Sequence, residues 1–323
     1  MNLFRSLLHW VYSKWDGFWF FEAPLLNLGC FRCLICAVLF LMDFSRQFDL
    51  KEFYTNQGLL PDSLSLSVIP EFYRPPFDWY FWNESSLSWA HGLLVAGLFL
   101  LMLGIGGRIL NLILWILHIA FLFRNYSIAF GADLIGGIFL LLLIPTNSCA
   151  RFSVMNLLGG RHRAKLKPAV LKEYLKPYTA MLTSVFYRLI QLQLCVVYIF
   201  TGMDKLKGQS WWDGTAIWTV LINPQMVVFD FSWLRQLPYV IAILTFSTVL
   251  FEMYFPVLVW NPKLRPFLLG LGVFFHLSVG ICMALVNFGL IMIAPYLLFL
   301  DETVLTRAVN RLNSRFFKGR LLS

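Results

Sequence analysis

Hydrophobic residues occur along this chain in long runs, separated by shorter polar segments. A helix that crosses a bilayer needs about 20 mostly apolar residues, because each residue adds about 1.5 Å along the helix axis. The pattern therefore predicts an all-α, polytopic transmembrane bundle of about eight helices. The expected spans are residues 24–44, 87–103, 109–123, 129–145, 181–202, 237–259, 266–285 and 288–300.

Two regions depart from simple spans. Residues 266–300 are too long for one crossing, so we expect a break near residues 286–289. The segment after that break is short, and we expect either a crossing or a half-buried, re-entrant segment. Residues 1–23 mix Phe, Trp and Leu with Arg5, His9 and Lys14, which is typical of an amphipathic interfacial helix rather than a cleavable signal. Residues 24–300 form the expected transmembrane domain, and residues 301–323 a basic cytoplasmic tail.

Composition agrees with this assignment. Hydrophobic residues make up 59% of the chain and charged residues 13%, against about 25% charged residues in soluble domains. The mean hydropathy is +0.70. These values exclude a disordered chain, a disulfide-rich secreted protein and a soluble cytosolic enzyme. The net charge of +9 comes from basic residues between apolar runs, so we expect a lipid bilayer as partner and no nucleic acid.

The distribution of loop charges predicts the orientation. Residues 46–86 carry three basic and six acidic residues, whereas residues 147–180 carry seven basic and one acidic residue. Basic loops stay in the cytoplasm, so we expect both termini to be cytoplasmic. Residues 46–86 and 204–236 would then lie outside. Both are rich in aromatic residues, as in residues 71–82 and at Trp211 and Trp212, and they fit either an interfacial aromatic belt or a lid over an outward-facing site.

Ionisable residues inside the spans are candidates for function, because a polar side chain in a membrane costs free energy. We expect six of them, from five helices, in the outer leaflet around an outward-facing polar cavity. The alternative is structural: Asp133 pairs with Arg124 or His118, and Lys205 extends to the interface. The six residues are Asp43, His91, His118, Arg124, Asp133 and Lys205.

Two further residues lie deeper in the predicted spans. Glu252 is expected toward the cytoplasmic side, where Arg32 or Arg188 could pair with it. His276 is expected near the midplane, either as a hydrogen-bonded core residue or as a functional one. The six cysteines lie in or beside apolar runs, so we expect packing roles and no metal site.

Several motifs resemble the HTTM (horizontally transferred transmembrane) domain, the membrane part of vitamin K-dependent gamma-glutamyl carboxylases. The strongest is YIFTGMDKL at residues 198–206, followed by WWDG at residues 211–214. FFH at residues 274–276, followed by NFG at residues 287–289, is similar to a histidine-bearing helix of that family and its break. FEMYFP around Glu252, GADLIGG at residues 131–137 and FRCLICAVLFLMD at residues 31–43 also fit.

The resemblance implies a lyase chemistry. In the carboxylases, an uncharged lysine deprotonates a vitamin K-type hydroquinone, oxygen converts the quinol into a strong base, and carbon dioxide adds to the glutamate carbanion that results. Lys205 matches that lysine and His276 the later histidine, so the resemblance implies a base and a positioning residue. A reduced quinone is the implied cofactor. Tyr126 stands where the carboxylases have a histidine.

Two functions therefore remain open. The first is a lysine-base enzyme that acts on a quinol or another lipid-soluble substrate at an outward-facing cavity lined by the residues above. The second is a non-catalytic membrane subunit for the maturation, export or immunity of a secreted peptide, because some short bacterial HTTM proteins resemble the membrane factor that matures peptide toxins. A secreted peptide or a companion maturation protein is then the expected partner, and the bacterial inner membrane the expected location.

Overall fold

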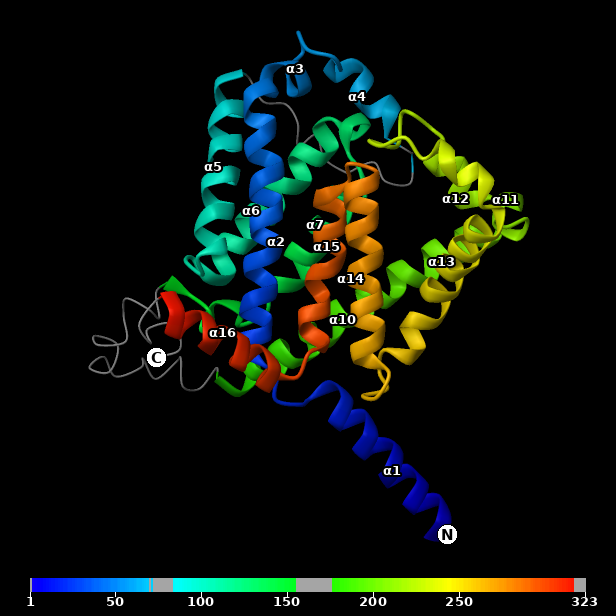
Figure 1. Ribbon diagram of the computed structural model, residues 1–323. Helices are drawn as coiled ribbons and strands as arrows, with labels where there is room; N and C mark the ends of the chain where they lie inside the picture. Colours follow the sequence, from blue (N-terminus) through cyan, green and yellow to red (C-terminus); the bar gives the residue numbers. More distant parts are fainter. Residues whose placement is uncertain (1, 70, 72–83, 155–175, 317–323) are drawn as a thin grey trace. The chain divides into compact units, whose positions relative to one another are not determined.

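The computed structural model describes residues 2–69, 71, 84–154 and 176–316 of the chain (Figure 1). The described residues form α-helices and short 3-10 helices joined by turns, and none of them is in a strand, which confirms the predicted all-α class. They divide into two compact units. Unit 1 comprises Met1–Leu189 and Leu300–Ser323, and unit 2 comprises Ile190–Phe299.

Unit 1 is built around α2 (Leu25–Arg46), which contacts α5, α7 and α16, while α6 packs against α5 and α7. The side of α2 that faces these helices is apolar, with Phe31, Ile35 and Leu39 fully buried. The other helices of unit 1 are α1 (Asn2–Trp19), α3 (Leu50–Tyr54), α4 (Asp62–Val68), α5 (Glu84–Met102), α6 (Gly107–Arg124), α7 (Gly131–Leu143), α16 (Glu302–Phe316), the first part of α10 (Lys176–Leu206), and the 3-10 turns η1 (Gln47–Asp49), η3 (Tyr126–Ile128) and η4 (Ser148–Ala150).

Arg32 ties α2 to the turn around η4. Its guanidinium is fully buried and donates to the carbonyl oxygens of Ser148 (2.7 Å) and Phe152 (2.5 Å). The opposite end of α2 carries Asp43 and Arg46, at the ends of α6 and α7 where Arg124 and Gly131 lie. A guanidinium has five N–H donors and can donate to carbonyl oxygens that a 3-10 turn does not pair. This explains a buried arginine at this position.

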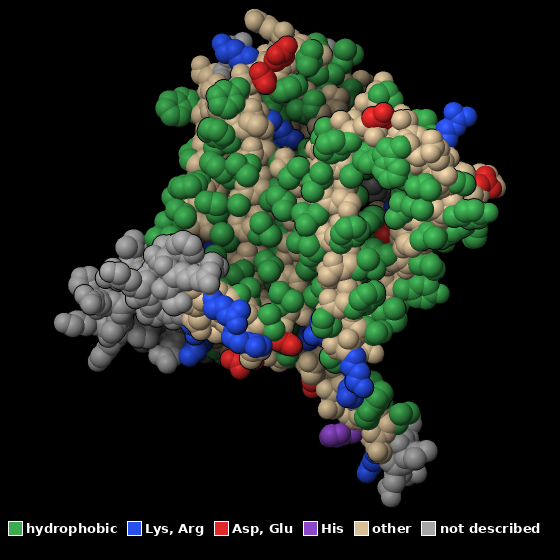
Figure 2. All heavy atoms as spheres, in the orientation of Figure 1, with side chains coloured by type: hydrophobic (Ala, Val, Ile, Leu, Met, Phe, Trp, Pro, Cys, Tyr) green, Lys and Arg blue, Asp and Glu red, His purple; other side chains and the backbone are tan. Residues whose placement is uncertain are grey.

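Unit 2 contains the remainder of α10, from Ile190, and two long helices that follow it. Side chains on the outer faces of α13 and α14 are exposed and hydrophobic, including Ile243, Val257, Phe267 and Phe274, as expected of a lipid-facing surface (Figure 2). The helices are α11 (Gln209–Trp212), α12 (Ala216–Leu221), α13 (Pro238–Leu258), α14 (Arg265–Cys282) and α15 (Val286–Ile293), with the 3-10 helices η6 (Ser232–Gln236) and η7 (Ala294–Phe299).

Helices α14 and α15 pack side by side, as Figure 1 shows. The contact is close because Gly289 faces the main chain of α14: a Cβ atom at this position would lie 2.5 Å from the carbonyl oxygen of His276. The turn between the two helices contains Ala284 in the left-handed region, with φ of 54°. The predicted break therefore exists, but α14 ends at Cys282, a few residues before the expected position.

Every predicted span coincides with a helix, and the lengths revise the count. Six helices among the described residues are long and apolar enough to cross a membrane, and a seventh is possible if Val286–Phe299 and Glu302–Arg311, which meet at a 113° bend, form one broken span. Helix α7 has 13 residues and is shorter than a crossing requires. The aromatic residues 72–82 and most of the basic segment 147–180 lie outside the described residues.

Replacing Gly289 with Ala should lower the stability of the protein by about 1–3 kcal/mol, because the new methyl group must push α15 away from the His276 carbonyl oxygen. Thermal unfolding in detergent, followed by circular dichroism, measures this change. Gly270→Ala on α14 is the matched control, since no atom lies within 4 Å of its added Cβ. Equal melting temperatures for the two variants would contradict the close packing of α14 and α15.

Candidate functional site

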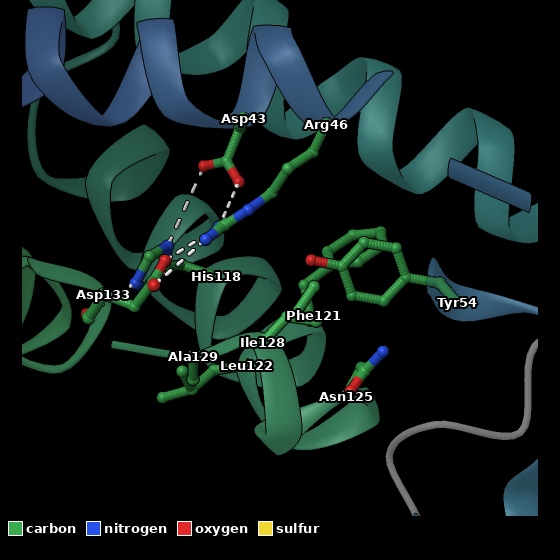
Figure 3. A pocket seen from close by; sticks show the side chains of 10 residues that line it. All are labelled: Asp43, Arg46, Tyr54, His118, Phe121, Leu122, Asn125, Ile128, Ala129 and Asp133. Atoms are coloured by element: carbon green, nitrogen blue, oxygen red, sulfur yellow. Dashed lines mark hydrogen bonds and ion pairs between the residues drawn. The ribbon is translucent and has the colours of Figure 1, made fainter. Parts of the chain in front are cut away.

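Ionisable side chains gather inside the helices at two places, one in each unit. The cluster in unit 1 centres on Arg46, at the last residue of α2. Its guanidinium binds Asp133 through two hydrogen bonds, Nη1 to Oδ1 at 2.7 Å and Nη2 to Oδ2 at 3.0 Å. Nη1 also donates to Asp43 Oδ1 at 3.2 Å, one turn earlier on α2 (Figure 3). One guanidinium therefore joins two buried carboxylates from two helices, in the bidentate geometry that favours arginine.

Asp133 occupies the first turn of α7, where a negative charge is stabilised by the helix dipole. Its Oδ2 accepts a hydrogen bond from the main-chain N–H of Phe130 (3.1 Å), in addition to those from Arg46. The carboxylate is thus well supplied with donors despite an exposure of 1%. The local sequence fits this role, since the helix begins at Gly131 directly after a residue in extended conformation.

His118 on α6 lies beside both carboxylates. Its Nε2 is 3.0 Å from the main-chain oxygen of Asp133, and its Nδ1 is 4.0 Å from Asp43 Oδ2. The ring packs over Gly137 of α7, where a Cβ atom would lie 3.2 Å from the ring carbon Cδ2. Gly137 of the GADLIGG segment therefore allows α7 to approach the imidazole closely.

These side chains border a small pocket that is partly open to solvent. Its walls are partly charged and partly apolar, and the hydroxyl of Tyr54 points into it (Figure 3). All of its residues belong to unit 1. The lining consists of Asp43, Arg46, Tyr54, His118, Phe121, Leu122, Asn125, Ile128, Ala129 and Asp133.

The other residues predicted for this site lie around the pocket rather than in its wall. The Nδ1 of His91 is 2.6 Å from Gln47 Oε1, and its ring meets Phe121 edge-on. Arg124 is buried and donates to the carbonyl oxygen of Leu60 (3.1 Å). Tyr126 begins the 3-10 turn η3 and is not among the lining residues.

The cluster in unit 2 begins with Lys205, near the end of α10. Its Nζ donates to Glu252 Oε2 of α13 at 2.7 Å and lies 5.4 Å from the centre of the Trp211 indole ring. The lysine side chain is 21% exposed, whereas that of Glu252 is 6% exposed. The ammonium group is thus held by a buried carboxylate and an aromatic ring, and the lysine side chain stays partly exposed.

A second polar group in unit 2 surrounds His276 of α14. The hydroxyl of Tyr198 is 2.6 Å from His276 Nε2 and also forms a hydrogen bond with the hydroxyl of Tyr296. All three side chains are buried. Aromatic rings enclose them, with Phe255 tilted against both tyrosines. His276 therefore belongs to a buried hydrogen-bonded chain of three side chains.

The observed pairs correct several sequence-based expectations. Asp133 pairs with Arg46, and Glu252 pairs with Lys205 rather than with Arg32 or Arg188. The carboxylate of Glu252 is consequently at the level of Lys205, not deeper toward the other end of the helices. Arg32 donates to carbonyl oxygens, and Arg188 stacks over Phe21 and donates to the Phe18 carbonyl oxygen.

The residues expected around one outward-facing cavity belong to both units. Asp43, His118 and Asp133 meet in unit 1, while Lys205 belongs to unit 2. The catalytic roles of Lys205 and His276 remain predictions. Within the described residues, three His, Cys, Asp or Glu side chains do not converge in a way that could hold a metal ion.

Sequence reasoning missed Arg46, Tyr198 and Tyr296. Arg46 follows Asp43 by three residues at the end of a span, so the i, i+3 spacing could have indicated it. Tyr198 precedes Lys205 by seven residues and therefore lies on the same face of α10. Tyr296 lies in η7, directly after α15, and no periodicity in the sequence places it beside Tyr198.

The fold and its buried ion pairs define a multi-pass integral membrane protein with an all-helical bundle. The chain is 26% identical over 125 residues to the sporulation-delaying protein SdpB of Bacillus subtilis, an alignment that covers 36% of this chain and 39% of that protein. It is 27% identical over 165 residues to the uncharacterized protein YitO of the same organism, covering 48% of this chain and 52% of YitO. No protein-family model and no solved structure matches the chain.

Replacing Arg46 with Met should destabilise the protein by about 3–5 kcal/mol, because it leaves two carboxylates buried without their cation. Thermal unfolding in detergent reports the loss. Lys207→Met is the matched control: its ion pair with Asp204 has both side chains exposed, and such pairs contribute about 0–1 kcal/mol. A similar melting temperature for both variants would show that the Arg46 cluster does not hold α2 to α7.

Proposed function

We propose that the protein is a multi-pass membrane factor that acts in the maturation or export of a secreted peptide. The observation that carries this proposal is the similarity to the sporulation-delaying protein SdpB. It agrees with the resemblance to short bacterial HTTM proteins that mature peptide toxins. Because the alignment covers 39% of SdpB, the proposal concerns the class of process and not a particular peptide.

The Lys205 ion pair suits the binding of a peptide. An ammonium group keeps three donor hydrogens, and a carboxylate that takes one of them leaves the others for a carbonyl or carboxylate oxygen. Glu252 and the Trp211 ring fix the position of the ammonium, and the partial exposure of the lysine side chain allows a second molecule to reach this part of unit 2. Charge-assisted hydrogen bonds of this kind are the stronger ones in proteins.

We propose further that this surface faces the extracytoplasmic side. The basic loops predicted for the other side support that orientation through the positive-inside rule. A factor of the bacterial inner membrane with this orientation meets its peptide as the peptide leaves the cytoplasm. A companion maturation protein could act at the same surface.

A second candidate function is the lysine-base enzyme, favoured by the short distance between Lys205 and Glu252. A lysine removes a proton only as a neutral amine, so the ammonium proton would first move to Glu252 Oε2, 2.7 Å away. The Trp211 ring and the lysine donor are groups of the kind that hold a quinone ring and its oxygen atoms, so the residues fit a quinol. A reduced quinone supplies electrons and protons to the reaction when it is bound.

Deleting the gene in the source organism should remove one or more peptides from the culture medium, as measured by mass spectrometry. Restoring the Lys205→Met, Glu252→Gln double variant should recover these peptides at a level roughly 10- to 100-fold lower than the wild-type chain does, because a charge-assisted contact of about 1.5–3 kcal/mol is lost. The double variant avoids a buried unpaired carboxylate, and immunoblotting of membranes checks its level.

Lys207→Met is the control for this experiment, since Lys207 is exposed and two residues from Lys205. It should restore the peptides fully. An unchanged set of secreted peptides after gene deletion would contradict the proposed process. Full recovery by the double variant would remove Lys205 and Glu252 from it.

The enzymatic candidate predicts that purified protein oxidises a reduced menaquinone analogue in the presence of oxygen. Lys205→Ala and Lys205→Arg should both abolish this activity, because neither side chain offers a neutral amine. Quinone absorbance follows the reaction, and Lys207→Ala is the matched control. Equal rates in the wild type and both Lys205 variants would exclude a lysine base, while leaving the peptide proposal intact.

A further inference from the structure

The pocket of unit 1 presents an unusual arrangement of hydrogen-bond acceptors. His118 Nε2 is 3.0 Å from the main-chain oxygen of Asp133. A carbonyl oxygen accepts hydrogen bonds and cannot donate them, so the proton of this bond belongs to Nε2. In a neutral imidazole the other nitrogen, Nδ1, would then carry a lone pair.

Nδ1 faces another acceptor. It lies 4.0 Å from Asp43 Oδ2, and no described residue donates a hydrogen bond to that oxygen. The Asp43 side chain is 2% exposed. A lone pair opposite a buried carboxylate oxygen is unfavourable, because burial strengthens the repulsion and leaves both acceptors unsatisfied.

The charges of the pocket also indicate that a positive charge is missing beside Asp43 Oδ2. Asp43 and Asp133 bring two negative charges to its wall, and Arg46 brings one positive charge, which is bound mainly to Asp133. Asp43 receives one hydrogen bond from Arg46, at 3.2 Å, on the oxygen that faces away from His118. One further positive charge beside Asp43 Oδ2 would balance the wall.

Other titratable groups surround His118 and Asp43 without supplying that charge at Oδ2. Tyr54 of α3 borders the pocket, His91 of α5 is engaged with Gln47, and Arg124 of α6 is directed to the Leu60 carbonyl oxygen. The titratable groups on the helices around the pair are Arg46 on α2, Tyr54 on α3, His91 on α5, Arg124 on α6 and Asp133 on α7.

We propose that this pocket is a proton-binding site, in which His118 is held as imidazolium between the Asp133 carbonyl oxygen and the Asp43 carboxylate. The bound proton sits on Nδ1 and points at Asp43 Oδ2. It comes from solvent and gives the two carboxylates two cationic partners, Arg46 and His118. The proton thereby joins α6 to α2, while Arg46 joins α2 to α7. This site is independent of Lys205 and of the proposed peptide function.

Nitrogen-15 NMR of histidine-labelled protein in detergent at neutral pH tests the proposal directly. We expect one buried histidine with a proton on both ring nitrogens, assigned to His118 by its loss in His118→Gln. Asp43→Asn should remove the proton from Nδ1 and leave a neutral ring with the proton on Nε2. Asp49→Asn, at an exposed position of the same segment, should leave the His118 signals unchanged.

The wild-type spectrum decides the question even if Asp43→Asn fails to fold. A neutral His118 ring with a bare Nδ1 would overturn the proposal, because the proposed proton would then be absent. A neutral ring protonated at Nδ1 would overturn it as well. An imidazolium that persists in folded Asp43→Asn would show that Asp43 does not hold the proton.

Discussion

A charge buried among apolar helices costs free energy unless an opposite charge or a hydrogen bond lies beside it. Both units are arranged around this constraint. In unit 1, Arg46 crosses from the end of α2 to Asp133 at the start of α7. In unit 2, Lys205 of α10 meets Glu252 of α13. Each pair fixes the relative position of two helices, because apolar contacts alone permit sliding or rotation.

Much of the fold could be predicted from the sequence, because a membrane-spanning helix needs a continuous run of apolar residues. Such a run can be recognised without knowing what the helix packs against. Each predicted span, from residues 24–44 to residues 288–300, falls on a helix. The count was less predictable. Whether 13 residues of α7 or the bent pair after Val286 cross a membrane depends on packing and on the bend, and neither follows from the hydrophobicity of the segment.

Some residues of the site were predictable, but its pairs were not. Depth along a span follows from the sequence, and it selected Asp43, His118 and Asp133 as neighbours, which meet in the pocket of unit 1. Rotation of a helix about its axis and the reach of a long side chain do not follow from depth. Asp133 binds Arg46, although the sequence indicated Arg124 or His118. Glu252 binds Lys205, although the sequence indicated Arg32 or Arg188.

The two ion pairs differ in a way that bears on function. The Arg46 guanidinium is bound to two carboxylates, each 2% exposed, so this cluster joins α2 to α7 and leaves few of its donors for another molecule. Lys205 is bound to one carboxylate, so its ammonium group keeps donor hydrogens for another acceptor. Because a cation that joins two carboxylates mainly positions helices, whereas a cation that binds one carboxylate can accept a further partner, we expect an external substrate at Lys205 and a structural role for the Arg46 cluster within unit 1.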